Sequence, residues 1–271
     1  MKKCLLTGFI FLFTLAAFSQ PGLHIGVFGT FNNTWIEKQD NYGTLAPFQN
    51  PVVRASELAY KYTWGGNGGV QVGYNFNKHW GVEAAILYNS TGQNYNDNFS
   101  GPATIPEGTF GAGGTPVNVQ RSIKLTYLQV PLMGKYTVGS RKLKFFAALG
   151  PQVGFRTSAR EQVKIAGYVY LPDSLAFTPG QRFQTFDLGL AVQAGVQVYF
   201  TRHIYAEFGL SAYQGVLDIN GAVLQQLGWY SKNDTHYKKS YNFDAGVTAG
   251  IHYLITFKKK IYYPSYTAPP N

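Results

Sequence analysis

Six charged residues of this chain fall on the polar side of segments that alternate apolar and polar side chains. They are Glu83, Lys135, Lys144, Asp187, Glu207 and Asp244. Carboxylates and ammonium groups that share a low-dielectric interior must pair, because an isolated buried charge is costly. We therefore expect a structural charged network that fills an interior. A gated conduit or an internal ligand site is the alternative use of the same residues.

Histidine and cysteine give weaker indications of chemistry. Five histidines lie far apart and lack the spacing of metal ligands: His24, His79, His203, His236 and His252. His236 lies near Ser231 and Asp234, the residue types of a nucleophilic triad. The one cysteine is Cys4. We predict no catalytic residue, no metal and no cofactor, and hence no enzyme, with a rim-active lipid hydrolase using His236 as an alternative.

The amino terminus has the three regions of a secretory signal peptide. Lys2 and Lys3 are followed by an apolar stretch up to Phe18, and small Ala17 and Ser19 precede position 20. The apolar stretch is too short for a spanning helix. We predict a signal peptide over residues 1–19, with a retained membrane anchor as the alternative.

The chain is basic, with a formal net charge of +10. Removing the leader takes away two lysines and leaves +8 by subtraction. Apart from Lys258–Lys260, the basic residues are scattered over turns, loops and the carboxyl-terminal tail. This scatter argues against nucleic acid as a partner. We expect contact with outer-membrane lipid headgroups or lipopolysaccharide instead.

Strict alternation of apolar and polar residues, with a period of two, predicts strands. We expect eight, of which the better bounded lie at about 23–35, 123–136, 143–155, 186–200 and 243–257, with others ending at Phe76 and starting at Trp80 and Ile204. Their links are alternately tiny (77–79, 138–141, 201–203) and long (about 36–57, 89–122, 156–185 and 214–240). This pattern is typical of an all-β fold, a transmembrane antiparallel up-and-down β-barrel of the Gram-negative outer membrane, with short periplasmic turns and long extracellular loops. A secreted sandwich or lipocalin-like barrel is the alternative.

The barrel interpretation divides the chain and assigns its aromatic residues. The barrel would occupy residues 20–257, and residues 258–271 would form a short basic periplasmic tail. Aromatic residues at strand ends would lie at the membrane interfaces: Phe76, Trp80, Tyr136, Phe200 and Phe257. Pro131 falls inside a predicted strand and favours a bulge or an irregular pair there.

Five short motifs are spread over the chain. They are the leader ending Phe18-Ser19-Gln20, Leu125–Leu132 (LTYLQVPL), Ala148–Pro151 (ALGP), Asp187–Gly189 (DLG) and Tyr213–Ile219 (YQGVLDI). In these motifs the chain resembles the PorT-like family of small outer-membrane β-barrel proteins of Bacteroidota. Gln129 stands where the family commonly has an acid. The resemblance implies an outer-membrane barrel, and the namesake of the family is linked to protein export by the type IX system.

Three functions are consistent with these observations. The first is a non-enzymatic barrel whose extracellular loops bind a protein or glycan partner, or which supports envelope integrity. The second is an accessory role in protein export, through periplasmic partners at the short turns and the tail. The third is the lipid hydrolase. Deleting residues 258–271 separates the first two, and His236→Ala would change lipid A composition only under the third.

Overall fold

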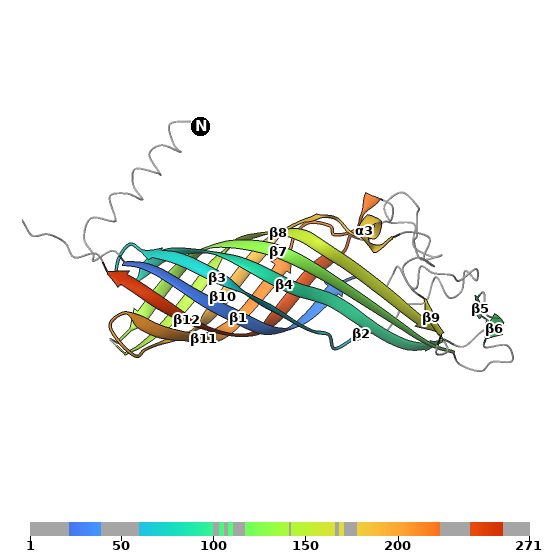
Figure 1. The fold of residues 1–271 in the computed structure, drawn as a ribbon, viewed down its shortest axis with the longest axis horizontal. Coiled ribbons are helices and arrows are strands. Elements are labelled where there is room, and N and C mark those ends of the chain that lie inside the picture. Colours follow the sequence, from blue (N-terminus) through green and yellow to red (C-terminus); the bar gives the residue numbers. More distant parts are fainter. Residues whose placement is uncertain are drawn as a thin grey trace, which may run out of the picture.

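The structure of the protein is a computed structural model (Figure 1). It describes residues 22–38, 60–99, 103–105, 108–110, 117–140, 142–165, 168–170, 178–222 and 239–256. The predicted leader, the predicted tail, Phe257 and His236 with its neighbours lie outside these ranges. Within them, no helix is long and apolar enough to cross a membrane.

Eight antiparallel strands close into a ring. In chain order they are β1 (Gly22–Glu37), β3 (Trp64–Asn75), β4 (Trp80–Phe99), β7 (Val117–Gly139), β8 (Leu143–Ile165), β10 (Phe186–Tyr199), β11 (Ile204–Gly215) and β12 (Tyr241–Thr256). Each pairs with the next along the chain, and β12 pairs with β1 from Gly22↔Thr256 to Glu37↔Tyr241. The eight-stranded up-and-down fold is confirmed.

One end of the ring carries the predicted short turns, and we call it the short-turn end. The first residue of β1 and the last of β12 also lie there. In the β3–β4 turn, Asn77 Oδ1 accepts hydrogen bonds from the backbone N–H groups of His79 and Trp80. In the β10–β11 turn, Thr201 Oγ1 accepts from His203 and Ile204 in the same way. These side chains replace backbone partners, which is why Asn and Thr suit the turns.

The opposite, long-loop end differs from the prediction, because β4, β7 and β8 continue far past the ring (Figure 1). β3 pairs with β4 only up to Ser90, and β10 pairs with β8 only up to Phe155. Beyond these points the three strands pair with one another up to Phe99, Val117 and Ile165. The predicted loops 89–122 and 156–185 therefore contain strand, extending by roughly 30 Å at about 3.3 Å per residue.

Short elements complete the long-loop end. β2 (Tyr60–Lys61) adds to β4, and β9 (Tyr168–Tyr170) adds to β8. β5 (Ala103–Ile105) and β6 (Gly108–Phe110) pair with each other. A one-turn helix, α3 (Pro179–Arg182), precedes β10. We call the four-stranded part formed by β2 and the extensions of β4, β7 and β8 the projecting sheet.

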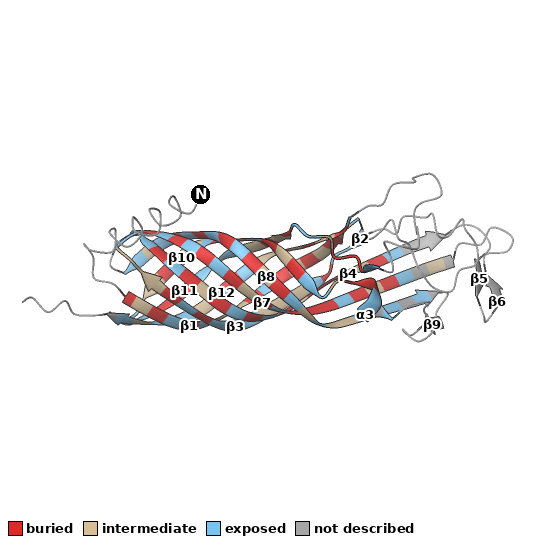
Figure 2. Cartoon of the chain, turned by 90° about the horizontal axis from the view of Figure 1, so that it is seen from above, coloured by how far each residue is buried: buried red, intermediate tan, exposed pale blue. Residues whose placement is uncertain are grey.

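Within the ring, apolar side chains point outward and polar ones inward, as predicted. Figure 2 shows the resulting alternation of buried and exposed residues along each strand. On β1, Ile25, Val27 and Phe31 are exposed, while His24 and Asn32 are buried. The same polarity holds on every strand of the ring, where Gln71, Gln129, Gln193 and Thr248 are buried.

The irregular pair predicted at Pro131 is present where β7 pairs with β4, because the register passes from Ala84↔Leu132 to Leu87↔Gln129 with no pairs between. A bulge lies elsewhere. The pairing of β7 with β8 has the same register on both sides of Pro131, which is opposite Gln152. The register shifts between Thr126 and Tyr127, where Thr157 of β8 is the extra residue. Its hydroxyl donates to the carbonyl of Thr126 at 3.2 Å. This bulge separates the ring from the projecting sheet.

Candidate functional site

The short-turn half of the interior contains a compact ion cluster. Lys135 Nζ lies 2.6 Å from Glu207 Oε2 and 3.0 Å from Glu83 Oε2. His24 Nε2 is 3.7 Å from the same Glu83 oxygen. The Lys135, Glu83 and Glu207 side chains are at most 3% exposed. One ammonium thus faces two carboxylates, and the His24 imidazole lies beside one of them.

Two histidines in this half lie against glycines of the neighbouring strand. A Cβ atom at Gly73 would lie 2.2 Å from the ring of His24, and one at Gly26 would lie 2.2 Å from the ring of His252. Each histidine is directly opposite its glycine in the register. The His252 ring also stacks on Tyr205 at a centroid distance of 4.9 Å. The glycines therefore make room for rings that fill the interior.

Lys144 lies nearer the short-turn rim and is half-buried. Its ammonium donates to the Tyr199 hydroxyl at 3.4 Å, and that hydroxyl donates to Gln197. Gln197 in turn donates to Glu207 at 3.0 Å. Lys144 thus connects to the ion cluster through two neutral side chains and makes no ion pair with a described residue.

Asp187 and Asp244 form a separate layer near the long-loop end of the ring. The Asn242 amide donates to Asp187 at 2.8 Å and to the Tyr127 hydroxyl at 3.2 Å. Asn89 donates to Asp244 at 3.3 Å. Neither aspartate has an ion pair within the described residues. The six predicted charges therefore divide between two layers, and only three of them form ion pairs with each other.

The Asn242 side chain donates hydrogen bonds to residues of two of the motifs that resemble the PorT-like family. Tyr127 belongs to Leu125–Leu132, and Asp187 belongs to Asp187–Gly189. A third motif, Tyr213–Ile219, packs on the second, because a Cβ at Gly189 would lie 2.6 Å from the Tyr213 ring. These short motifs are far apart in the sequence and meet in one layer of the interior.

A second ion cluster lies in the projecting sheet, and sequence reasoning missed it. Glu161 pairs with Arg121 at 2.6 Å and with Arg182 at 2.5 Å, and all three side chains are buried. Burial by itself raises the pKa of Glu161, but the two guanidinium charges outweigh it and place that pKa below its ordinary value. Burial lowers the pKa of Arg182 to about 10. The cluster fastens α3 to the inner face of the sheet.

Arg156 holds the same segment from the edge of the ring. Its guanidinium donates to the carbonyls of Gly180, Phe183 and Gln184 at 3.0–3.1 Å. The segment also bonds to the region after β11, where Gln184 N–H donates to the Ile219 carbonyl. The buried side chains Phe183, Ile219 and Asn220 thus form a cap beside the mouth of the ring.

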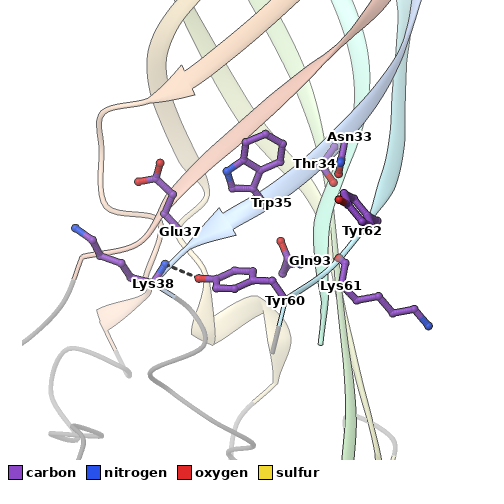
Figure 3. A pocket seen from close by; sticks show the side chains of 9 residues that line it. All are labelled: Asn33, Thr34, Trp35, Glu37, Lys38, Tyr60, Lys61, Tyr62 and Gln93. Atoms are coloured by element: carbon purple, nitrogen blue, oxygen red, sulfur yellow. Dashed lines mark hydrogen bonds between the residues drawn. The ribbon is translucent and has the colours of Figure 1, made fainter. Parts of the chain in front are cut away.

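A hollow of about 820 Å³ opens in the wall at the long-loop end, where β1 and β2 separate (Figure 3). The last backbone bond there runs from Thr34 N–H to the Thr63 carbonyl. Farther out, the Tyr60 hydroxyl accepts from the Lys38 N–H at 3.1 Å. Trp35, Glu37, Lys61 and Tyr62 also line the hollow. It combines aromatic rings with charges of both signs.

Four of the five predicted interface aromatics are at or beside the short turns. Trp80, Tyr136 and Phe200 are exposed, and Phe76 is half-buried against the edge of Tyr74. The Trp80 and Tyr136 rings touch at a centroid distance of 4.8 Å. Phe257 lies outside the described residues. Among those residues, no group of three or more His, Cys, Asp or Glu is arranged to hold a metal.

A closed antiparallel ring that is apolar outside and polar inside defines a membrane-type β-barrel. A model of the outer membrane protein beta-barrel domain family matches residues 18–220, and the chain belongs to this family. The finer resemblance to PorT-like proteins stays a prediction. Comparison with curated proteins gave no match.

Several solved outer-membrane proteins are similar over most of the chain at low identity. Neisserial surface protein A (NspA) is 12% identical with a TM-score of 0.38, over 85% of this chain and 96% of that one. Ail, the attachment invasion locus protein of Yersinia pestis, is 12% identical with a TM-score of 0.33, over 87% and 99%. OprG of Pseudomonas aeruginosa is 12% identical with a TM-score of 0.32, over 88% and 96%.

Proposed function

We propose that this protein is a non-enzymatic outer-membrane barrel with a closed lumen, which uses its long-loop end as a binding surface outside the cell. The observation that carries the proposal is a contrast between two parts of the molecule, the filled ring and the strands that continue beyond it. Inside the ring, the Lys135 cluster is buried from water. Beyond it, β4, β7 and β8 continue as paired strands. Such a surface would also let the protein support envelope integrity by tethering a partner.

The closed lumen follows from the size of the ring. Eight strands leave an interior just wide enough for side chains to fill. Here the filling side chains are charged and paired, and breaking such a pair leaves an uncompensated buried charge. A network of this kind is a structural plug, which supports a binding role over a conducting one.

The binding role is supported by the contacts that hold the described α3 segment in place at the long-loop end. Binding residues are commonly carried by loops and extensions that a rigid scaffold positions. The Glu161 cluster and the Arg156 bonds fix α3 against the sheet. The hollow beside Trp35 and Tyr62 adds a concave surface with aromatic rings (Figure 3).

Cysteine labelling tests which end faces outward, because Cys4 is the one cysteine and lies in the predicted leader. Gln181→Cys, exposed on α3 at the long-loop end, should react with a membrane-impermeant maleimide on intact cells. Lys142→Cys, exposed at the short-turn end, is the matched control. It should react only after the outer membrane is permeabilised. The reverse pattern would show that the projecting sheet is periplasmic and the proposal is wrong.

The closed lumen is tested in planar lipid bilayers with the purified barrel. We expect no stepwise ion conductance at neutral pH. Opening the plug with Lys135→Ala, Glu83→Ala and Glu207→Ala together should produce conductance if the folded ring persists on a detergent gel. Steady channels from the unaltered protein would contradict the proposal.

A further inference from the structure

The outward face of the projecting sheet combines cations with amides. Its cations are Lys61, Lys124, Arg160 and Lys164, and its exposed amides include Gln120 and Gln162. We call these six residues the cationic face. No acidic side chain is described on this face, and none of the four cations forms an ion pair within the described part of the chain. The acid Glu161 points to the opposite, buried face.

The register places these cations around a small neutral centre. Lys124 is directly opposite Arg160, and Lys164 is opposite Gln120. A single cross-strand row runs from Lys61 through Asn94 and Ser122 to Gln162. With strands about 4.8 Å apart and residues about 3.3 Å apart, the cations border a patch of roughly 13 by 14 Å. A shallow hollow of about 140 Å³ lies within it.

This arrangement is unfavourable without an anion. Like charges directly opposite each other on a sheet destabilise it, and Lys124 and Arg160 are such a pair. An anionic group between them would turn repulsion into two attractions, and a guanidinium binds phosphate with two parallel hydrogen bonds. The amides of Gln120 and Gln162 can donate to and accept from hydroxyl groups. Phosphate and hydroxyl groups together are the chemistry of a phosphorylated sugar.

We infer that the cationic face binds the phosphorylated saccharide of lipopolysaccharide in the surrounding outer leaflet. This inference rests on the proposed function and names the partner of its long-loop end. The position of the cationic face indicates the source of this saccharide, because the face continues the lipid-facing side of the same strands. Lys124 lies four residues, or roughly 13 Å along the strand, beyond exposed Leu128. The part of a lipid directly above its acyl chains in that leaflet is its phosphorylated saccharide.

The test is an equilibrium titration of the purified barrel, in nanodiscs of neutral phospholipid, with rough-type lipopolysaccharide. The face variant is Lys124→Gln with Arg160→Gln. The control variant is Lys142→Gln with Arg202→Gln, which removes the same charge from exposed positions at the short-turn end. Migration of boiled and unboiled samples on a detergent gel verifies that each variant is folded. We expect about thirtyfold weaker binding for the face variant, from about fivefold per cation near an anionic surface.

Three outcomes would overturn the inference. The control variant could lose as much affinity as the face variant, or chemically dephosphorylated lipopolysaccharide could bind as tightly as the intact form. Lipid-free core oligosaccharide could also bind as tightly as lipopolysaccharide, which would make a soluble glycan the ligand. The labelling of Gln181→Cys, which lies outside the cationic face, is independent of all three. If that label fails on intact cells, the proposed function fails whatever the titration gives.

Discussion

The ammonium of Lys135 lies 2.6 Å from the carboxylate of Glu207, inside a ring whose outer surface is apolar. Because Lys135 also contacts Glu83, its removal leaves two buried carboxylates without their cation. We expect Lys135→Met to lower the free energy of unfolding by about 3–5 kcal/mol. Urea titration of the refolded barrel, followed by the gel shift between folded and unfolded forms, measures this.

A second variant separates the charge effect from a packing effect. Lys135→Met combined with Glu83→Gln and Glu207→Gln replaces the ion cluster by neutral groups and should recover most of the lost stability, because fully replacing a buried ion pair is often neutral. Lys142→Met, at an exposed position, should change little. If the triple variant is no more stable than Lys135→Met alone, the ion pairs are not what the lysine contributes.

The fit of the His24 ring against Gly73 predicts a steric effect. A Cβ at Gly73 would lie 2.2 Å from the imidazole, so Gly73→Ala should destabilise the barrel by about 1–3 kcal/mol through overpacking. Gly134→Ala is the matched control, since its Cβ would meet nothing closer than 3.9 Å. Adding His24→Ala to Gly73→Ala should relieve the clash with the ring and leave only the approach to the Val82 carbonyl at 2.9 Å. A Gly73→Ala barrel as stable as the parent would contradict the arrangement.

The ring could be predicted from the sequence because each of its strands repeats one rule, apolar outside and polar inside. Inward positions such as Glu83 and Lys135 follow from that period of two. The sequence does not predict which inward charges lie at the same depth in the ring, because this depends on the stagger of the strands around the ring. Asp187 and Lys135 have the same orientation, yet they lie in different layers.

The extensions of β4 and β8 and the part of β7 before Ile123 were predicted as loop, because the polarity of the outward side chains reverses at the bulge beside Tyr127. Past it, Ile123 and Leu125 are buried inward, and Lys124 points outward. A search for strands with outward apolar residues misses this part of the sheet, because its outward residues are polar and exposed to water. The Glu161 cluster could not be predicted from the sequence either. Arg121 and Glu161 meet only through the register of two strands, and Arg182 comes from a separate segment.

The three hydrogen bonds from Arg156 to backbone carbonyls predict that its removal changes only the segment around α3. Arg156→Ala should loosen the α3 segment, which Arg182 still ties to Glu161 of β8, while the ring stays folded, since hydrogen bonds from a charged group contribute about 1.5–3 kcal/mol. Limited proteolysis should then cut within residues 178–185 at a lower protease concentration, with unchanged heat-modifiable migration. Arg156→Lys should restore little, because an ammonium lacks the guanidinium's planar set of donors. Unchanged cleavage in both variants would exclude the anchoring role.

The Glu161 cluster predicts that the projecting sheet loosens in acid before the ring does. The pKa of Glu161 in the folded protein lies below its ordinary value of 4.5. A carboxylate of this kind adds stability above its unfolded pKa and loses it as the pH falls through the lower folded pKa. Backbone amides of β7 and β8 beyond the bulge should therefore lose protection from hydrogen exchange below about pH 4.5, after correction for the intrinsic exchange rate. Amides of the ring near Glu83 serve as the internal reference.

Glu161→Gln should lower protection of the projecting sheet at pH 7, because it leaves Arg121 and Arg182 buried beside a neutral group, and should flatten the acid dependence. If the sheet of Glu161→Gln loosens in acid as steeply as that of the parent, another carboxylate sets its stability.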